Sequence, residues 1–266
     1  MGDDEGRPGF REWLDGQPDP EWKLLPLTHI TKAIVAEDVV RANGISPTEC
    51  DRIGDIVAYF YYGRPAYRAN KDQVIKIDAA CPVCFVLDSS IITGAKKIFA
   101  FDSGAFLARM YKHVLIDEMN LDDFSLGSRA DRLNKLVHAA FTTKENYFDG
   151  NRAALTLPTV GAEPWQYSAR AYLELLASQG RNEPDDRVCS IEVLFDQLVS
   201  LENALLAIVV PHTHWRASGK SPWLADLESR GVSVLPYNFI PGKHPEYYQT
   251  QIESVVRSYY EENSLL

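Results

Sequence analysis

The sequence predicts a mixed α+β fold rather than a doubly wound parallel sheet. Strand-like runs outnumber helical runs early in the chain, and few strands alternate with helices at the spacing of a parallel crossover unit. No G-x-G-x-x-G segment follows a strand, and the sequence contains no G-x-x-x-x-G-K-[ST] loop. A Rossmann or P-loop nucleotide site is therefore disfavoured.

The composition is that of a globular protein with a sizeable core. The chain has 266 residues, of which 45% are hydrophobic, enough for one large domain or one domain with an appendage. Its net charge of -10 disfavours an extended basic surface for duplex DNA. The longest apolar runs, such as residues 204–210, are far shorter than a membrane span. With an acidic start, no apolar signal segment and four cysteines, we expect a reduced cytoplasmic protein without membrane contact.

The predicted elements of the first half follow from side-chain spacing and from helix-ending residues. Residues 1–22 are rich in glycine, proline and acidic residues and are expected to form a loosely ordered lead-in, with Trp13 and Trp22 as anchors. A helix over residues 32–43 has apolar residues at helical spacing and ends at Gly44. Strands are predicted over residues 24–30, 56–62, 74–77, 83–87 and 97–101.

The second half combines polar, broken stretches with regular elements. Residues 142–164 and 179–187 are expected to be loops. Helices are predicted over residues 130–141, 168–178, 221–230 and 245–262, and strands over residues 188–195, 205–210 and 232–235. We expect one main domain over residues 23–215, with residues 216–266 as a C-terminal strand–helix appendage packed on it.

Three short segments in a fixed order carry the functional prediction. The first, Leu27-Thr28-His29-Ile30-Thr31, places His29 and Thr31 on one face of a strand, because strand side chains repeat every second residue. Thr31 is also a natural N-cap for the helix that follows it. The other two segments are a tyrosine-rich strand that runs into a Gly-Arg-Pro turn over residues 59–68, and Cys189-Ser190-Ile191-Glu192-Val193.

These segments resemble the ADP-ribosyltransferase superfamily, and their pattern is closest to that of the DNA-targeting DarT-type toxins. In those toxins a first strand carries a histidine with a threonine two residues later, and an aromatic strand ends in Pro-Arg-Ser-Pro. Gly63-Arg64-Pro65-Ala66 stands at the second position here. Residues 98–105 resemble the family's Phe-Thr-Asp-Gly-Asn-Ala segment, and residues 187–193 resemble its glutamate-bearing strand. The resemblance covers roughly residues 24–212.

The resemblance implies a split pair of small, mostly antiparallel sheets with flanking helices around an NAD cleft. The implied activity is transfer of ADP-ribose from NAD to a macromolecular acceptor, with release of nicotinamide. Glu192 would stabilise the positive charge of the transition state and accept the proton of the nucleophile. The alternative for Glu192 is an exposed strand glutamate.

The same resemblance assigns binding roles to residues of the first two segments. His29 and Thr31 would contact a ribose of NAD, and Tyr59 and Tyr61, which share a strand face, would offer flat surfaces to the nicotinamide ring. Arg64 would pair with the pyrophosphate or steer the glutamate, and Arg68 is a weaker candidate for that role, whereas a surface salt bridge is the alternative for Arg64. The tyrosines could equally pack in the core.

The expected cofactor is NAD, as substrate, and no metal is expected. A toxin or phage-defence setting would follow from the resemblance, with a cognate inhibitor as a further partner. The segment Thr142–Asn151 is expected to be a polar, aromatic-bearing loop that reads the acceptor, for which single-stranded nucleic acid is one candidate. NAD hydrolysis, or a catalytically silent nucleotide-binding module of the same fold, remain alternatives.

The remaining chemically notable residues have simpler interpretations. Cys81 and Cys84 are expected to be packing cysteines rather than a redox or metal pair, and Asp102 is expected to cap a helix. His212 and His214 lie on one strand face but lack a visible third ligand. A solvated acidic face is expected from Asp117, Glu118, Asp122 and Asp123.

Overall fold

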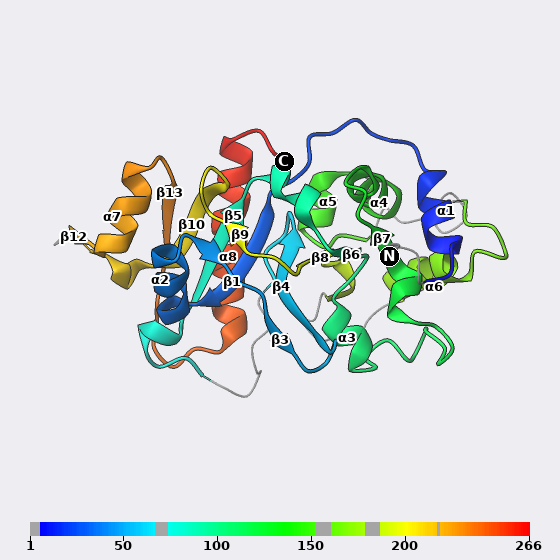
Figure 1. Ribbon diagram of the computed structural model, residues 1–266, viewed down its shortest axis with the longest axis horizontal. Helices are drawn as coiled ribbons and strands as arrows, with labels where there is room; N and C mark the ends of the chain where they lie inside the picture. The colour runs from blue at the N-terminus through cyan, green and yellow to red at the C-terminus, as the bar shows by residue number, and fades with distance from the viewer. Residues whose placement is uncertain (1–5, 67–73, 153–160, 179–186, 217–218) are drawn as a thin grey trace. The chain divides into compact units, whose positions relative to one another are not determined.

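The computed structural model describes residues 6–66, 74–152, 161–178, 187–216 and 219–266, and it belongs to the predicted α+β class. Helices and strands occur in both of the compact units into which the chain divides (Figure 1). Unit 1 comprises residues 1–24, 48–57 and 92–196. Unit 2 comprises residues 25–47, 58–91 and 197–266.

Unit 2 contains a mixed sheet in the strand order β13-β10-β5-β1-β4. Its strands are β1 (Leu27–Lys32), β4 (Asp55–Tyr62, which begins in unit 1), β5 (Pro82–Leu87), β10 (Leu205–Pro211) and β13 (Ser233–Tyr237). Neighbours are antiparallel except β10 and β13, which are parallel. All six residues of β5 are buried, which explains why its sequence is a continuous apolar run without alternation.

Three helices cover this sheet. They are α2 (Ala33–Arg41), α7 (Pro222–Ser229) and α8 (Pro245–Glu262). Helix α2 packs on β1, β5 and α7, whereas α8 packs on β13, β10 and β5 and passes behind the strands in Figure 1. The buried face of α8 consists of Tyr248, Ile252, Val256 and Tyr260, four residues apart, so one apolar stripe of an otherwise polar helix faces the sheet.

Short elements complete unit 2. Strand β2 (Gly44–Ile45) pairs with β9 (Val199–Ser200), and β11 (Trp215–Arg216) pairs with β12 (Gly219–Lys220). Single turns of 3-10 helix occur at Asp78–Ala80 and His212–His214.

Unit 1 has a smaller antiparallel sheet in the order β8-β6-β7. The strands of this sheet are β6 (Lys97–Phe99), β7 (Ser125–Gly127) and β8 (Glu192–Phe195). A further strand of unit 1, β3 (Thr48–Cys50), pairs with the first residues of β4. Its helices are α1 (Gly9–Asp15), α3 (Ser103–Leu107), α4 (Asp131–Phe141), α5 (Lys144–Phe148) and α6 (Tyr167–Ala177).

The N-terminal segment differs from the loosely ordered lead-in that the sequence predicted over residues 1–22. Residues 9–15 form α1, and Phe10, Trp13 and Leu14 are buried on one face of it. The ring of Phe10 lies 5.4 Å from that of Tyr172 in an edge-to-face arrangement. Trp13 is thus an anchor, as predicted, but of a helix rather than of a loose chain.

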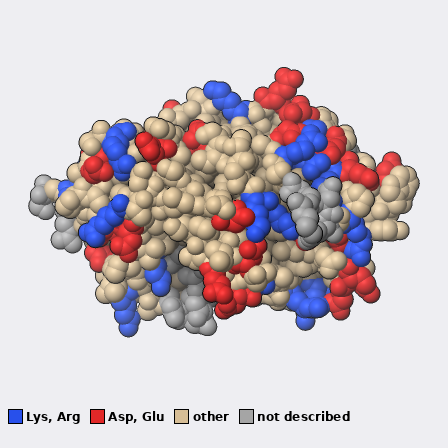
Figure 2. Space-filling view, viewed as in Figure 1, with Lys and Arg blue, Asp and Glu red and all other residues tan. Residues whose placement is uncertain are grey.

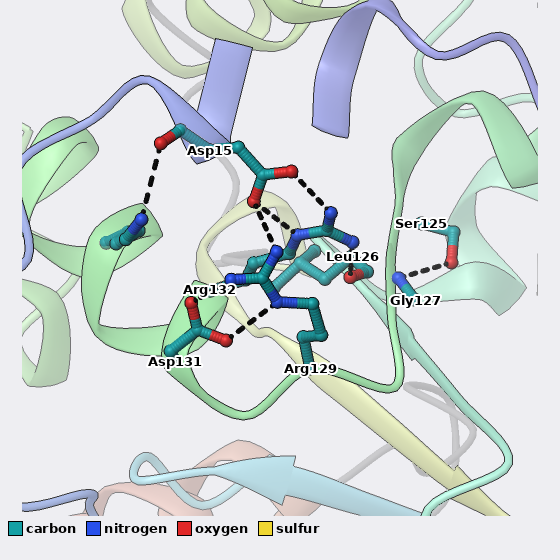
Figure 3. A network of polar contacts seen from close by, with 8 residues as sticks. Asp15, Ser125, Leu126, Gly127, Arg129, Asp131 and Arg132 are labelled. Atoms are coloured by element: carbon teal, nitrogen blue, oxygen red, sulfur yellow. Dashed lines mark hydrogen bonds and ion pairs between the residues drawn. The ribbon is translucent and has the colours of Figure 1, made fainter. Parts of the chain in front are cut away.

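An ion-pair network fastens the end of α1 to the rest of unit 1 (Figure 3). Arg132 of α4 donates to both carboxylate oxygens of Asp15, at 2.8 and 2.6 Å, and to the carbonyl of Leu126 at 2.7 Å. The Arg132 guanidinium lowers the pKa of Asp15 below its ordinary value. Arg129 adds a longer contact to Asp15 at 3.3 Å.

Most predicted elements are present, with differences at their ends. The predicted strand over residues 74–77 is absent, and Ile75 makes only an isolated bridge to Lys243. The predicted strand over residues 188–195 begins at Glu192, because residues 187–189 form a 3-10 turn. Of the loop predicted over residues 179–187, residues 179–186 lie outside the described residues.

The predicted solvated acidic face is wrong for one of its members. Asp123 is buried, and it accepts hydrogen bonds from the backbone N–H and the guanidinium of Arg7. Asp117 and Glu118 are exposed as expected. On the face shown in Figure 2, lysine and arginine side chains lie interspersed among acidic ones. Within the described residues, no helix combines the length and apolar character needed to cross a membrane.

Candidate functional site

Glu192 is the first residue of β8 in unit 1 and is almost completely buried, with 1% of its surface exposed. The alternative of an exposed strand glutamate is therefore wrong. The backbone N–H of Ser103 donates to its Oε2 at 3.2 Å. The other residues of β8, Val193, Leu194 and Phe195, are buried and apolar, so the carboxylate of Glu192 occupies a position where an apolar side chain would be expected.

One partner of this carboxylate lies in the turn before α3, where the sequence predicted a helix cap. Asp102 caps α3 by accepting a hydrogen bond from the backbone N–H of Ala105 at 2.6 Å, as predicted. The cap orients the next residue, Ser103, so that its N–H reaches Glu192. The hydroxyl of Ser103 is fully buried and has no hydrogen-bond partner among the described residues. Ser103 was missed as a site residue, although the Asp102–Ala105 cap signal pointed to it.

His29 lies in β1 of unit 2, beside Phe85 of β5. Its Nδ1 lies 2.8 Å from the backbone carbonyl oxygen of Tyr59. A carbonyl can only accept, so Nδ1 carries the proton and Nε2 presents a lone pair. Burial lowers the pKa of His29 below its ordinary value, so the ring is neutral at pH 7. A neutral ring with a fixed tautomer can accept a hydrogen bond from a ligand hydroxyl.

The other predicted binding residues of the strands have different surroundings. Thr31 is half-buried, and its hydroxyl makes no hydrogen bond within the described residues. The alternative role of Thr31 as a helix cap is wrong, because Lys32 is the N-cap residue of α2. Tyr61 is buried and pairs in register with Thr28 across the β1–β4 ladder, whereas Tyr59 is half-buried.

Arg64 lies at the Gly-Arg-Pro turn after β4, where Gly63 has φ 65° as the turn requires. Its side chain is only 7% exposed, so the alternative of a surface salt bridge is wrong. A guanidinium nitrogen of Arg64 lies 3.5 Å from Oε1 of Glu253 in α8. Thr28 of β1 donates its hydroxyl to the carbonyl of Arg64 at 3.2 Å.

Helix α8 holds this turn at two further points that sequence reasoning missed, and a third hydrogen bond within α8 orients the residues involved. The hydroxyl of Tyr260 donates to the carbonyl of Gly63 at 2.8 Å. The amide of Gln249 donates to the carbonyl of Pro65 and to Oε1 of Glu253, both at 2.8 Å. The predicted C-terminal appendage thus contributes the residues that fix the arginine turn. No local signal links these segments, since the contacts depend on packing of distant parts of the chain.

The predicted acceptor loop over Thr142–Asn151 has a different structure. Residues 144–148 form α5, and its aromatics Tyr147 and Phe148 are buried. The Tyr147 hydroxyl accepts a hydrogen bond from the backbone N–H of Ile191. This segment therefore supports the strand that carries Glu192 and offers no exposed aromatic face for a base.

His212 and His214 have hydrogen-bond partners within the fold, and Cys81 and Cys84 are buried. His212 Nδ1 accepts from the N–H of Phe239 at 3.0 Å, and His214 Nδ1 lies 3.2 Å from the hydroxyl of Ser221. Cys81 and Cys84 are free and buried, and burial raises the pKa of the Cys81 thiol to about 12. In the described part of the chain, no group of three or more His, Cys, Asp or Glu side chains could hold a metal ion.

The candidate residues thus fall into two sets. His29, Thr31, Tyr59, Tyr61 and Arg64 belong to unit 2, Glu192 belongs to unit 1, and Arg68 lies outside the described residues. Comparison with models of protein families, with curated proteins and with solved structures gives no match.

Proposed function

We propose that this protein is an ADP-ribosyltransferase of the DarT-like kind, which transfers ADP-ribose from NAD to a macromolecular acceptor and releases nicotinamide. The observation that carries the proposal is the buried Glu192 carboxylate. Burying a carboxylate costs several kcal/mol unless it is paired or hydrogen-bonded, and such groups concentrate at functional sites. Its position matches the glutamate of the family pattern, and the capped turn at Ser103 holds it.

The chemistry assigns each residue a role. Cleavage of the bond between nicotinamide and ribose develops positive charge on the ribose, and the Glu192 carboxylate stabilises it and accepts the proton of the incoming nucleophile. His29 accepts a hydrogen bond from a ribose hydroxyl through Nε2, and the half-buried Tyr59 packs against the nicotinamide ring. Arg64, buried in the turn, binds the pyrophosphate.

The test is nicotinamide release from NAD by wild type and by Glu192→Gln. The amide oxygen of glutamine can still accept the N–H of Ser103, so the variant is expected to fold, while its rate falls by at least about 100-fold. Glu202→Gln, at an exposed glutamate, is the matched control. Near-normal release by Glu192→Gln would remove Glu192 from the reaction.

A second measurement separates binding from chemistry. His29→Ala is expected to weaken NAD binding, measured by calorimetry, more than it slows the reaction, because its contact is to a ribose and not to the breaking bond. Unchanged affinity in the folded variant would leave His29 with a structural role only.

The acceptor is identified by supplying adenylate-labelled NAD with single-stranded DNA, RNA and cell protein in parallel. Label on one of them names the acceptor class. Nicotinamide release without labelled macromolecule indicates an NAD hydrolase. No release at all rejects the enzymatic proposal and favours a silent binding module.

A further inference from the structure

Unit 1 contains a pocket that includes none of the candidate site residues. It has a volume of about 290 Å³ and is built from one continuous stretch of chain, from Phe106 at the end of α3 to Asn120. Small-molecule sites usually measure about 300–1,000 Å³, so this pocket is of the size for one ring with a short substituent rather than for a dinucleotide.

The apolar part of the pocket is exposed yet rigidly supported. The ring of Phe106 stacks on Phe101 at 6.0 Å with an interplanar angle of 12°, and Phe101 is fully buried. Leu107 and Ile116, which also line the pocket, are 38% and 58% exposed. Exposed aliphatic side chains around a supported aromatic wall gain free energy when a flat apolar group covers them.

The rim of the pocket carries an unpaired positive charge. The guanidinium of Arg109 on this rim pairs with the carboxylate of Asp117, so the two charges compensate each other. Lys112 is exposed and makes no ion pair with any described residue. One cation next to an apolar, aromatic cavity complements a ring that bears a single negative charge.

We propose that this pocket binds a small aromatic monoanion, with its ring between Phe106, Leu107 and Ile116 and its anionic group at Lys112. The pocket shares α3 with Glu192, since Ser103 at the start of this five-residue helix donates to Glu192 and Phe106 and Leu107 near its end line the pocket. A ligand in the pocket therefore contacts the helix that holds the buried carboxylate.

The test compares phenylacetate with phenylacetamide, which have the same ring and differ in charge. Titrations of the full chain are followed by amide chemical shifts in residues 106–120. Saturable shifts are expected there, with phenylacetate binding about fivefold tighter, the ratio expected for one exposed charge pair. Lys112→Gln is expected to abolish the preference, and Ile116→Ser is expected to weaken both ligands.

Lys76→Gln is the control, because Lys76 is an exposed lysine of unit 2 without an ion pair among the described residues and its substitution changes the net charge equally. The proposal is overturned if neither ligand shifts residues 106–120 at millimolar concentration, or if Lys112→Gln keeps the preference for phenylacetate. Because binding alone is measured, the outcome does not depend on whether the protein cleaves NAD.

Discussion

Glu253→Gln should destabilise the protein because it removes the charge that faces the buried Arg64 from α8. Losing one partner of a fully buried ion pair costs about 3–5 kcal/mol. The contact here is long, at 3.5 Å, and Glu253 is 27% exposed, so solvent screens part of the interaction. Glutamine also keeps an acceptor for Gln249. We therefore expect a loss of about 1–2 kcal/mol in the free energy of unfolding.

The assay is urea denaturation of wild type, Glu253→Gln, Arg64→Gln and the double variant. The double-mutant cycle should give a coupling energy of about 1 kcal/mol. Glu261→Gln on the same helix is the control, because the exposed pair of Glu261 with Arg257 is four residues apart and contributes about 0.5 kcal/mol or less. If Glu253→Gln and Glu261→Gln unfold alike and the coupling vanishes, α8 does not hold the arginine turn through this charge.

Three further outcomes are expected. The pKa of His29 is lowered by burial in the folded protein, so the stabilising effect of the neutral ring is present above the ordinary pKa of 6.5 and is lost as the pH falls below it. Between pH 7.5 and 5.5, the free energy of unfolding measured in urea should therefore fall less for His29→Gln than for wild type. Asp15→Asn should cost about 1 kcal/mol at pH 7 by thermal unfolding, since Asp15 is 38% exposed, and equal stability would discount the network of Figure 3. In native protein, the half-buried Cys50 should react with a thiol reagent before Cys81 and Cys84, whose pKa is raised by burial, and the reverse order would contradict their packing.

Features that depend on neighbouring residues were predictable from the sequence. The periodicity of residues 245–262 predicts α8, and the apolar run at 83–87 predicts β5. The Gly-Arg-Pro turn at Arg64 and the Asp102 cap are also present as predicted. Each depends on side-chain spacing or on the backbone preferences of a few adjacent residues, which act over one or two turns of chain.

Features that depend on distant partners were not predictable. The burial of α1, of Asp123 and of Tyr147 results from packing against segments far away in the sequence. For this reason the segment predicted as a loosely ordered lead-in contains the packed helix α1. The segment predicted as an acceptor loop contains α5, whose buried Tyr147 contacts the backbone next to Glu192.

The candidate site shows the same division. The sequence by itself determined which residues are candidates for a functional site, since Glu192, His29 and Arg64 stand out by residue type and by the motifs around them. Only the tertiary structure decided their environments: a carboxylate that is buried and held by Ser103, a histidine whose tautomer is fixed by the Tyr59 carbonyl, and an arginine held by α8. Burial and hydrogen bonding set the charge and orientation of each group, and both depend on chain segments that meet only after folding.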